Sequence, residues 1–532
     1  MLKITNFLIS LDEDQKWPEI VYSKTGLKES GVKEIKILHR AVDARKKDKI
    51  LLNYTLGVVG SGSDEELQRL LKPRIVSSII KVDEPESELV LGEKALLHRP
   101  VVVGMGPAGL FGALYLARRG YCPIILERGK KVEERGEDVA GFWQGLKPFN
   151  SRSNVQFGEG GAGTFSDGKL TARNKDPRAG SILRDLVDAG APEEILYQSK
   201  PHIGTDILRK VLVNLRQTLL DLGAEICFEE QLTELEIREG NLAQIRTSTG
   251  RELPAEALIL AIGHSARDTY EMLFRRKILL EPKAFAVGLR IEHPQEWLNQ
   301  AQYGNFANHP SLGAADYMLS HQSQNGRGVY TFCMCPGGEV VASASEEGHV
   351  VVNGMSFFAR SSGIANSAVV ASVLPEDWNK EVLGGIEFQR KWERQAFDLG
   401  GWDYSAPIQS VGEFLGNSKE AFLCAPTYRP QVREADLREA LPSEVTISLQ
   451  EGLRSFGRKI KGFDHAGAVL TGVETRTSAP VRILRDLSGE SVSCRGLYPT
   501  GEGAGYAGGI VSAAIDGVRQ AERIMQKYRP VK

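Results

Sequence analysis

The chain lacks the features that would assign its 532 residues to a membrane, secreted or disulfide-stabilised class. No run approaches the roughly 18 uninterrupted apolar residues of a membrane-spanning helix. Six cysteines at scattered positions form no disulfide framework and suit a reducing compartment. The opening stretch MLKITNFLISLDEDQKW turns acidic after a short apolar run, which predicts a first strand and not a signal peptide. We therefore expect a cytoplasmic protein without a membrane span.

A strong charge of one sign is also absent. Lys and Arg total 66 against 68 Asp and Glu, which removes the simplest argument for a nucleic-acid partner but leaves a local patch open. No cluster of His, Cys and Asp has metal-ligand spacing, so we expect no metal site. Neither a G-x-S-x-G nor a Walker motif is present. The composition, 42% hydrophobic and 25% charged, is that of a globular protein with a sizeable core.

Residues 1–88 form a pattern of their own. The predicted elements are strand 3–10, helix 14–24, strands 33–41 and 50–59, a helix opened by Ser63-Asp64-Glu65-Glu66, and strand 75–82. The order βαββαβ is that of a ferredoxin-like module. The acidic segment 83–88 is the predicted boundary of this module.

A dinucleotide-binding fingerprint follows. The apolar strand 101–103 leads into Gly104, Met105, Gly106, Pro107, Ala108 and Gly109, and a helical pattern covers 110–119. In this G-x-G-x-x-G motif Gly104 permits a tight turn, Gly106 lets a pyrophosphate approach, and Gly109 lets helix and strand pack closely. The helix N-terminus supplies N–H groups and partial positive charge to the phosphates.

A second strand, 123–126, ends in Glu127, close to the expected spacing of about 20 positions after the first glycine. A carboxylate there is expected to accept hydrogen bonds from the adenosine ribose hydroxyls. It would also repel a 2′-phosphate, so this site is not expected to hold NADP.

The C-terminal stretch resembles the second FAD motif of the glutathione-reductase-like flavoprotein superfamily. Strand 497–500 leads into Gly501 and Glu502, where the superfamily usually has Asp, and a helix begins near Gly509 and Ile510. The resemblance implies that Glu502 binds the ribityl chain and that the helix N-terminus faces the flavin.

Two further segments carry the same resemblance. In 257–268 an apolar strand ends at Gly263, where the chain is expected to cross near the cofactor, and Leu232 follows an adenine-side strand at 225–228. These matches favour FAD over NAD. No second G-x-G-x-x-G is visible, so any nicotinamide donor must bind transiently or be replaced by another reductant.

The expected fold class is α/β with three domains. Residues 96–282 and 471–532 form a Rossmann-type FAD-binding domain, because the C-terminal strand, glycine loop and helix are too small to be stable alone. Residues 283–470 form an inserted mixed α+β lobe that binds substrate. Residues 1–88 are the ferredoxin-like module.

Nearly the whole chain resembles the bacterial uncharacterised FAD-dependent dehydrogenase family. The resemblance rests on KPHIGTD at 200–206, CMCPGG at 333–338, GVETRTSAP at 472–480 and VDARKK at 42–47. It implies a dehydrogenase-like activity, but a fold does not define a reaction.

The segment GEGGAGTFSDGK at 158–169 is too rich in glycine for the interior of a helix or strand. We expect Gly160 and Gly161 to contact the cofactor and Lys169 to lie near its ring or phosphates; a long ordered surface loop is the alternative. Arg128 and Arg135 are further cofactor candidates, although solvated helix charges explain them nearly as well.

Candidates for catalysis remain open. Cys333 and Cys335 would close only a small, strained disulfide ring, which favours packing over a redox role. His202 and His264 suit acid–base chemistry or a structural hydrogen bond. Glu474 and Arg476 share a strand face, where they pair or hold an acidic substrate.

The favoured function is an FAD-dependent oxidoreductase that transfers a hydride between the flavin and a small-molecule substrate or external electron donor. The first alternative is a flavin-dependent RNA-modifying protein that docks RNA on the basic residues Arg40, Arg45, Lys46, Lys47 and Lys49. The second is a flavin-binding redox sensor without turnover.

Overall fold

The computed structural model describes residues 1–81, 89–171, 176–417 and 419–531. The chain forms two compact units. The first combines Met1–Glu88, Pro192–His202 and Gln295–Ala315, and the second contains the rest. The predicted linker at 83–88 lies outside the described residues. No helix within the described ranges is both long and apolar enough to cross a bilayer.

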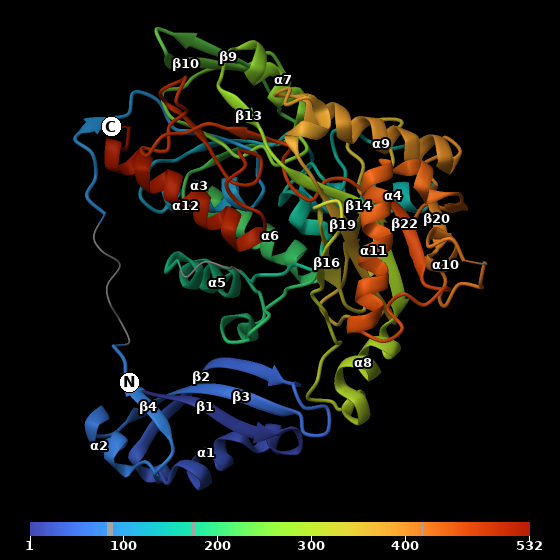
Figure 1. Ribbon diagram of the computed structural model, residues 1–532. Helices are drawn as coiled ribbons and strands as arrows, with labels where there is room; N and C mark the ends of the chain where they lie inside the picture. The colour runs from blue at the N-terminus through green and yellow to red at the C-terminus, as the bar shows by residue number, and fades with distance from the viewer. Residues whose placement is uncertain (82–88, 172–175, 418, 532) are drawn as a thin grey trace. The chain divides into compact units, whose positions relative to one another are not determined.

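The first unit holds a four-stranded antiparallel sheet in the order β2-β3-β1-β4. Its elements are β1 Leu2–Ser10, α1 Trp17–Thr25, β2 Val32–Asp43, β3 Leu51–Gly60, α2 Asp64–Leu70 and β4 Val76–Ile79. Helices α1 and α2 lie on one face of the sheet and share its core (Figure 1). Ser63 caps α2 by accepting a hydrogen bond from the N–H of Glu66.

Two distant segments complete the first unit. The backbone of Arg40 in β2 bonds with segment 192–202, donating to the carbonyl of Tyr197 at 2.7 Å and accepting from Ser199 at 2.8 Å. Helix α8, Gln295–Tyr303, supplies the carbonyl of Ala301 to Lys47 Nζ at 2.6 Å. The predicted module 1–88 left out both segments, because backbone pairing over such sequence separations has no local pattern.

The second unit contains a five-stranded parallel sheet in the order β24-β12-β6-β7-β8. Its strands are β24 Leu497–Pro499, β12 Leu258–Leu260, β6 Val101–Val103, β7 Ile124–Leu126 and β8 Glu225–Cys227. Helices α3, Pro107–Ala117, and α12, Ile510–Lys527, run side by side (Figure 1). Their close approach requires glycine at position 517, because a Cβ there would lie only 2.0 Å from the carbonyl oxygen of Ala108.

A seven-stranded sheet forms the other large layer of this unit, in the order β15-β16-β19-β14-β22-β20-β21. The strands are β15 Ser320–Gln322, β16 Gly328–Cys335, β19 Ile364–Val373, β14 Phe285–Pro294, β22 Val469–Glu474, β20 Ala406–Ser410 and β21 Val432–Glu434. Helix α9, Gly384–Gly400, packs against β20, and α11, Ser443–Lys459, packs against β19. Central β14 is buried along nearly its whole length.

Smaller elements connect these layers. The other helices are α4 Val132–Trp143, α5 Arg178–Asp188, α6 Thr205–Asp221, α7 Arg267–Arg275 and α10 Val411–Phe414. The remaining strands are β9 Leu232–Arg238, β10 Asn241–Thr247 and β11 Glu252–Pro254 in one sheet, and the pairs β13 Leu280–Pro282 with β23 Val481–Ile483, β17 Glu339–Ala342 with β18 Val352–Met355, and β5 Lys94–Ala95 with β25 Tyr528–Arg529.

Candidate functional site

Four loops meet at the carboxyl edge of the parallel sheet. They carry Gly104 after β6, Glu127 after β7, Gly263 after β12 and Gly501 after β24. The chain leaves β6 toward β7 on one side and pairs β6 with β12 on the other. Open α/β sheets bind ligands at such a switch point, beyond the carboxyl ends of the strands. The sheet therefore gathers the predicted cofactor residues at one edge.

Glu127 is only 5% exposed, and its carboxylate accepts three backbone hydrogen bonds. Oε2 accepts from the N–H of Met105 at 2.8 Å, while Oε1 accepts from Gly129 at 2.9 Å and Gly158 at 3.0 Å. The side chain thus ties three loops together. About one of the roughly four acceptor positions of a carboxylate remains for the predicted ribose contact.

The glycine-rich segment folds against the fingerprint loop. The N–H of Gly160 donates to the carbonyl of Met105 at 2.8 Å, and a Cβ at Gly161 would lie 3.1 Å from Cα of Gly106. Gly160 and Gly161 have φ of +83° and +62°, which favours glycine. The predicted pair therefore lies beside the fingerprint, where backbones approach closely.

Arg135 on α4 uses all five N–H groups within the protein. Nε donates to the carbonyl of Asn154, Nη1 to Glu159 carbonyl and Thr164 Oγ1, and Nη2 to the carbonyls of Val155 and Gly161. It is fully buried. This arrangement leaves no N–H for the phosphate contact considered from the sequence. Arg135 instead fixes the shape of the glycine-rich segment.

Two helix N-termini at this edge have no side-chain cap. Helix α3 starts after Gly106 and α12 after Gly509, and neither N-cap residue accepts a hydrogen bond through a side chain. Their terminal N–H groups carry partial positive charge and are suited to an anionic ligand. A Cβ at Gly263 or Gly508 would meet open space. Uncapped helix ends beside open, glycine-lined backbone fit a dinucleotide with a pyrophosphate.

Glu502 follows Gly501 at the end of β24. Burial raises its pKa to about 7, with Lys283 opposing the shift and Cys333 adding to it. The Tyr270 hydroxyl donates to the carbonyl of Gly503 at 2.6 Å and braces this loop. A neutral carboxylic acid can both donate to and accept from a hydroxyl-bearing chain, as the predicted ribityl contact requires.

Two other predicted cofactor residues have protein partners. Arg128 makes a bidentate pair with Asp268 at 2.9 and 3.2 Å, and its guanidinium lies 4.2 Å from the Phe157 ring centroid. Leu232 opens β9, where it pairs with Thr247, and its side chain is buried in the core. Their predicted contacts with FAD stay predictions.

Cys333 and Cys335 lie at the end of β16 beside Arg290 of β14. The Arg290 guanidinium donates to the Cys333 carbonyl at 3.2 and 3.3 Å and pairs with Glu474 through Nε at 2.8 Å. Lys169 belongs to the same cluster, since both thiols act on its pKa. Glu474 thus pairs with Arg290 and not with Arg476.

Arg476 belongs to a separate buried ion cluster. It makes two bonds with Glu393 of α9, at 2.8 and 3.0 Å, and Arg267 makes two more, at 2.7 and 3.0 Å. All three side chains are almost inaccessible. One carboxylate shared by two guanidinium groups is a structural arrangement that joins α9 to the segment that follows the β12 loop.

The two histidine candidates are in different units. His264 lies in the β12 loop, with Nδ1 2.9 Å from Ser265 Oγ. Burial, with Arg476 and Arg267 adding to it, lowers the pKa of His264 to about 3, so its imidazole is neutral at physiological pH. His202 ends the 192–202 segment of the first unit.

Sequence reasoning missed Arg290 and Glu393. Arg290 interrupts the apolar strand pattern FAVGLRI, and Glu393 occupies the buried face of the amphipathic α9. A charged residue at a core position is a signal for a buried partner. No pattern in the sequence indicates which residue is that partner.

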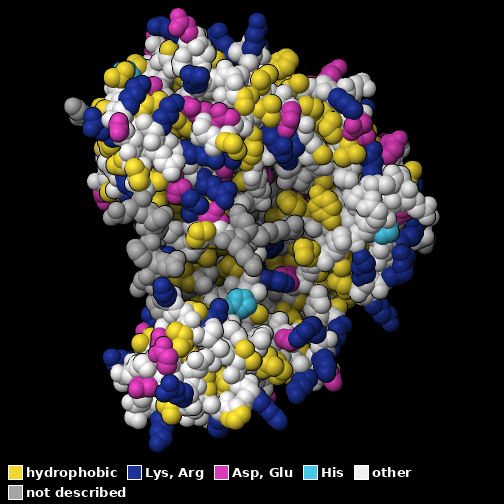
Figure 2. Space-filling model, turned by 60° about the vertical axis from the view of Figure 1, so that its left-hand side comes forward, with side chains coloured by type: hydrophobic (Ala, Val, Ile, Leu, Met, Phe, Trp, Pro, Cys, Tyr) yellow, Lys and Arg dark blue, Asp and Glu magenta, His cyan; other side chains and the backbone are white. Residues whose placement is uncertain are grey.

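Three of the five basic residues considered for RNA docking have partners within the first unit. Arg45 pairs with Asp43 at 2.6 Å, Arg40 pairs with Asp14 at 2.8 Å, and Lys47 donates to a carbonyl. On the face shown in Figure 2, Lys and Arg side chains are interspersed with acidic and hydrophobic ones. These contacts give no support to RNA as a partner.

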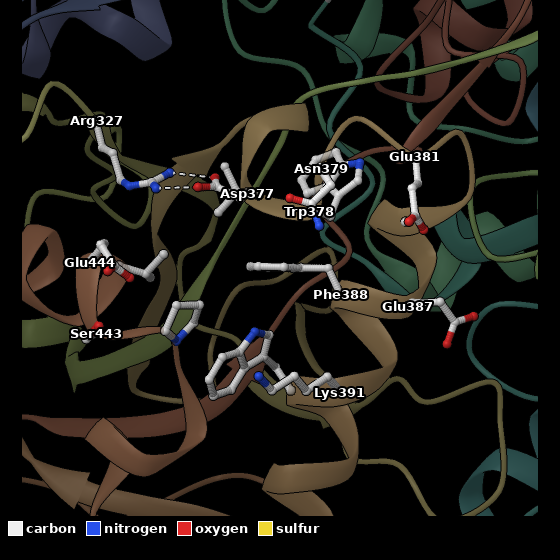
Figure 3. A pocket seen from close by; sticks show the side chains of 15 residues that line it. Arg327, Asp377, Trp378, Asn379, Glu381, Glu387, Phe388, Lys391, Ser443 and Glu444 are labelled. Carbon is white, nitrogen blue, oxygen red and sulfur yellow. Dashed lines mark hydrogen bonds and ion pairs between the residues drawn. The ribbon is translucent and has the colours of Figure 1, made fainter.

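A separate cavity of about 610 Å³ lies between η6, Pro375–Trp378, and the starts of α9 and α11. Figure 3 shows the Phe388 ring crossing its middle and Arg327 paired with Asp377 at one side. Phe388 and Lys391 line this cavity, whereas Glu393 projects from the opposite face of α9 toward Arg267. The cavity is therefore distinct from the glycine-lined edge.

The family is identified by comparison. A model described as FAD-dependent protein, C-terminal domain-like, matches residues 284–477, and a domain of unknown function matches 1–59. An uncharacterized protein of Clostridium beijerinckii is 49% identical over 532 residues, with 99% of each chain covered. The chain belongs to this family of uncharacterised FAD-dependent proteins, and its cofactor is FAD. The predicted family and cofactor are confirmed.

Solved flavoproteins are more distant. CtdE in complex with FAD is 14% identical, with 79% of this chain and 82% of that chain covered at a TM-score of 0.31. Glycine oxidase from Bacillus cereus is 11% identical, with 81% and 98% covered at a TM-score of 0.33. Neither likeness carries an argument about the reaction.

Proposed function

We propose that the chain is an FAD-dependent oxidoreductase whose parallel sheet is a Rossmann-type cofactor domain. The observation that carries the proposal is the meeting of four glycine or glutamate loops and two uncapped helix N-termini at one sheet edge. FAD, when bound, supplies two-electron transfer. The protein's part is to bind, orient and shield it.

The individual residues divide that task. Gly106 and Gly161 leave room for the pyrophosphate, and the N-terminus of α3 stabilises its charge. Glu127 holds the surrounding loops and retains an acceptor for ribose. Glu502 is the proposed partner of the ribityl chain. The match at 284–477 overlaps nearly all of the predicted lobe 283–470, which we propose as the substrate side. The first unit has the element order of a ferredoxin-like module.

The purified protein is expected to be yellow and to release intact FAD on denaturation, because nothing in the proposal requires a covalent bond. The measurement is the visible spectrum before and after denaturation, with chromatography of the released flavin. A colourless protein that FAD cannot reconstitute would overturn the proposed function. Turnover is tested by anaerobic flavin reduction with NADH, NADPH and a metabolite panel; a flavin that no donor reduces would favour a sensor without turnover.

A glycine variant locates the cofactor. In Gly106→Ala the new Cβ has no atom nearer than 3.8 Å, so the fold accepts it, but it fills space that a pyrophosphate needs. We expect FAD to bind about tenfold more weakly, equivalent to about 1.4 kcal/mol. Gly31→Ala, whose Cβ also meets open space, is the matched control. Equal affinities for the two variants would place the pyrophosphate elsewhere.

Glu502 gives stability a defined pH dependence. Its folded pKa of about 7 lies above the ordinary value of 4.5, so the native state binds more protons between these values and stability falls as pH rises through that window. Glu502→Gln removes this contribution. The difference in unfolding free energy between wild type and variant is therefore expected to change between about pH 4.5 and 7 and to be flat above. If this free-energy difference did not depend on pH, Glu502 would not be protonated in the folded state over this window.

A further inference from the structure

The thiol pair occupies a strained and specific position. Cys333 has φ of +41°, a left-handed conformation that non-glycine residues rarely adopt, and the pairing of β16 with β19 is irregular between Phe332 and Cys335. Bulges of this kind re-aim side chains and are found beside active sites. The irregularity breaks the alternation of the strand at this point, but the two thiols act directly on each other, which requires the two sulfurs to lie close together.

The two thiols differ in exposure and protonation. Cys333 is partly exposed, while Cys335 is buried and its Sγ donates to the Cys333 carbonyl at 3.3 Å. The interaction between the two thiol groups, together with the charges of Lys169 and Arg290, holds the pKa of Cys333 well below its usual range. The interaction between the thiols, together with burial, raises the pKa of Cys335. An accessible thiolate with a buried thiol beside it is the asymmetry of an attacking and a resolving cysteine.

Charged groups surround the pair on several elements. Arg290 of β14 donates to the Cys333 carbonyl, and Lys169 Nζ is buried without a hydrogen-bond partner among the described residues, 3.7 Å from Asp167. The acids facing the pair are Asp167, Glu474 and Glu502; Asp167 is itself held by Arg360 at 2.9 Å. Lys169 and Arg290 act more strongly on the Cys333 thiol than Asp167 does, and they favour a thiolate.

Glu502 links this pair to the cofactor edge. The charge of Cys333 acts on Glu502, which directly follows Gly501 in the β24 loop. The pair and the proposed ribityl-binding acid are therefore neighbours in space although about 170 positions separate them in sequence. A redox-active group in this position adjoins the flavin end of the proposed FAD site.

We propose that Cys333 and Cys335 form a redox-active thiol pair that exchanges electrons between bound FAD and a disulfide substrate; this rests on the proposed function. The Cys333 thiolate attacks one sulfur of the substrate disulfide, forming a mixed disulfide and releasing the first thiolate. Cys335 then attacks the Cys333 sulfur, and the second substrate thiolate leaves with the Cys335 proton. The substrate gains two electrons and the pair loses two. Two electrons and one proton return the pair to the thiolate and thiol; FAD, when bound and reduced by an external hydride donor, would supply the two electrons and become oxidised.

Alkylation tests the thiolate without relying on activity. Iodoacetamide labelling of the full chain, mapped by mass spectrometry across pH, is expected to modify Cys333 rapidly at neutral and mildly acidic pH. Cys424, Cys227 and Cys494, whose pKa values burial raises to about 12, about 11 and about 11, serve as internal controls. Lys169→Met is expected to move the Cys333 midpoint upward by about 1 to 3 pH units. Labelling of Cys333 no faster than the controls would overturn the assignment.

Electron counting tests the pair. After oxidation with glutathione disulfide, anaerobic dithionite titration of the FAD-loaded chain is expected to consume about four electrons, two for flavin and two for the disulfide. Cys333→Ser should consume about two electrons, whereas Cys335→Ser lacks the resolving thiol and should retain one glutathione on Cys333, seen by mass spectrometry, and consume about four. Two electrons in wild type, four in Cys333→Ser, or no bound glutathione in Cys335→Ser would overturn the proposal. A chain without flavin absorbance would refute the proposed function instead, while the alkylation result would still decide the thiolate.

Discussion

Glu127→Ala is expected to lower FAD affinity by about 100-fold or more. The substitution leaves the buried N–H groups of Met105, Gly129 and Gly158 without their acceptor, and each such group costs about 1–3 kcal/mol. A 100-fold change corresponds to about 2.8 kcal/mol, so loss of one or two of these bonds suffices. The measurements are bound flavin per chain and the dissociation constant of the apoprotein.

Two variants separate loop organisation from general damage. Glu127→Gln keeps an amide oxygen that can accept from some of the three N–H groups. Its FAD affinity should therefore lie between those of wild type and Glu127→Ala. Glu230→Gln is the matched control, because Glu230 is equally buried, at 7% exposure, but bonds to Thr247 and Thr249. FAD binding of wild-type strength in Glu127→Ala would show that the loops keep their shape without this carboxylate.

The local motifs were the predictable part of the fold. Strand 101–103, the glycine fingerprint and Glu127 follow each other within one short stretch, and their spacing directly reflects one βαβ unit. The helix predicted at 110–119 begins at Pro107 and ends at Ala117, because proline is accommodated in the first turn. The helix predicted at 14–24 divides into a 3-10 turn, Leu11–Lys16, and α1. Local sequence sets the elements but not their exact ends.

The thiol cluster could not be assembled from the sequence. Lys169, Arg290, Cys333 and Glu474 come from four separated segments, and no periodicity links them. The glycine loop predicted a cofactor contact for Lys169, whereas tertiary packing adds the two thiols to its surroundings. Likewise the alternation of Glu474 and Arg476 suggested that the two share a face and pair. Instead Glu474 pairs with Arg290, and Arg476 pairs with Glu393. Long-range pairing of buried charges depends on which strands become neighbours.

Glu393→Ala is expected to destabilise the second unit by about 3–5 kcal/mol, because it removes the buried carboxylate that Arg267 and Arg476 share and leaves Arg267 with only the part-buried Glu346. Glu387→Ala on the same helix is the matched control: its side chain is 68% exposed and its pair with Arg390 is expected to contribute at most about 1 kcal/mol. The measurement is denaturant unfolding of both variants followed by intrinsic fluorescence.

The pH dependence of that difference identifies the carboxylate as the cause. Arg267 and Arg476 outweigh burial and hold the pKa of Glu393 well below the ordinary 4.5. A depressed folded pKa contributes stability that is present above the unfolded pKa and is lost as pH falls through the folded value. The gap between wild type and Glu393→Ala should therefore be full at neutral pH and shrink below about pH 4.5. A gap that stays constant into acid would mean that the packing of the Glu393 side chain, and not its shared charge, stabilises the contact between α9 and its neighbours Arg267 and Arg476.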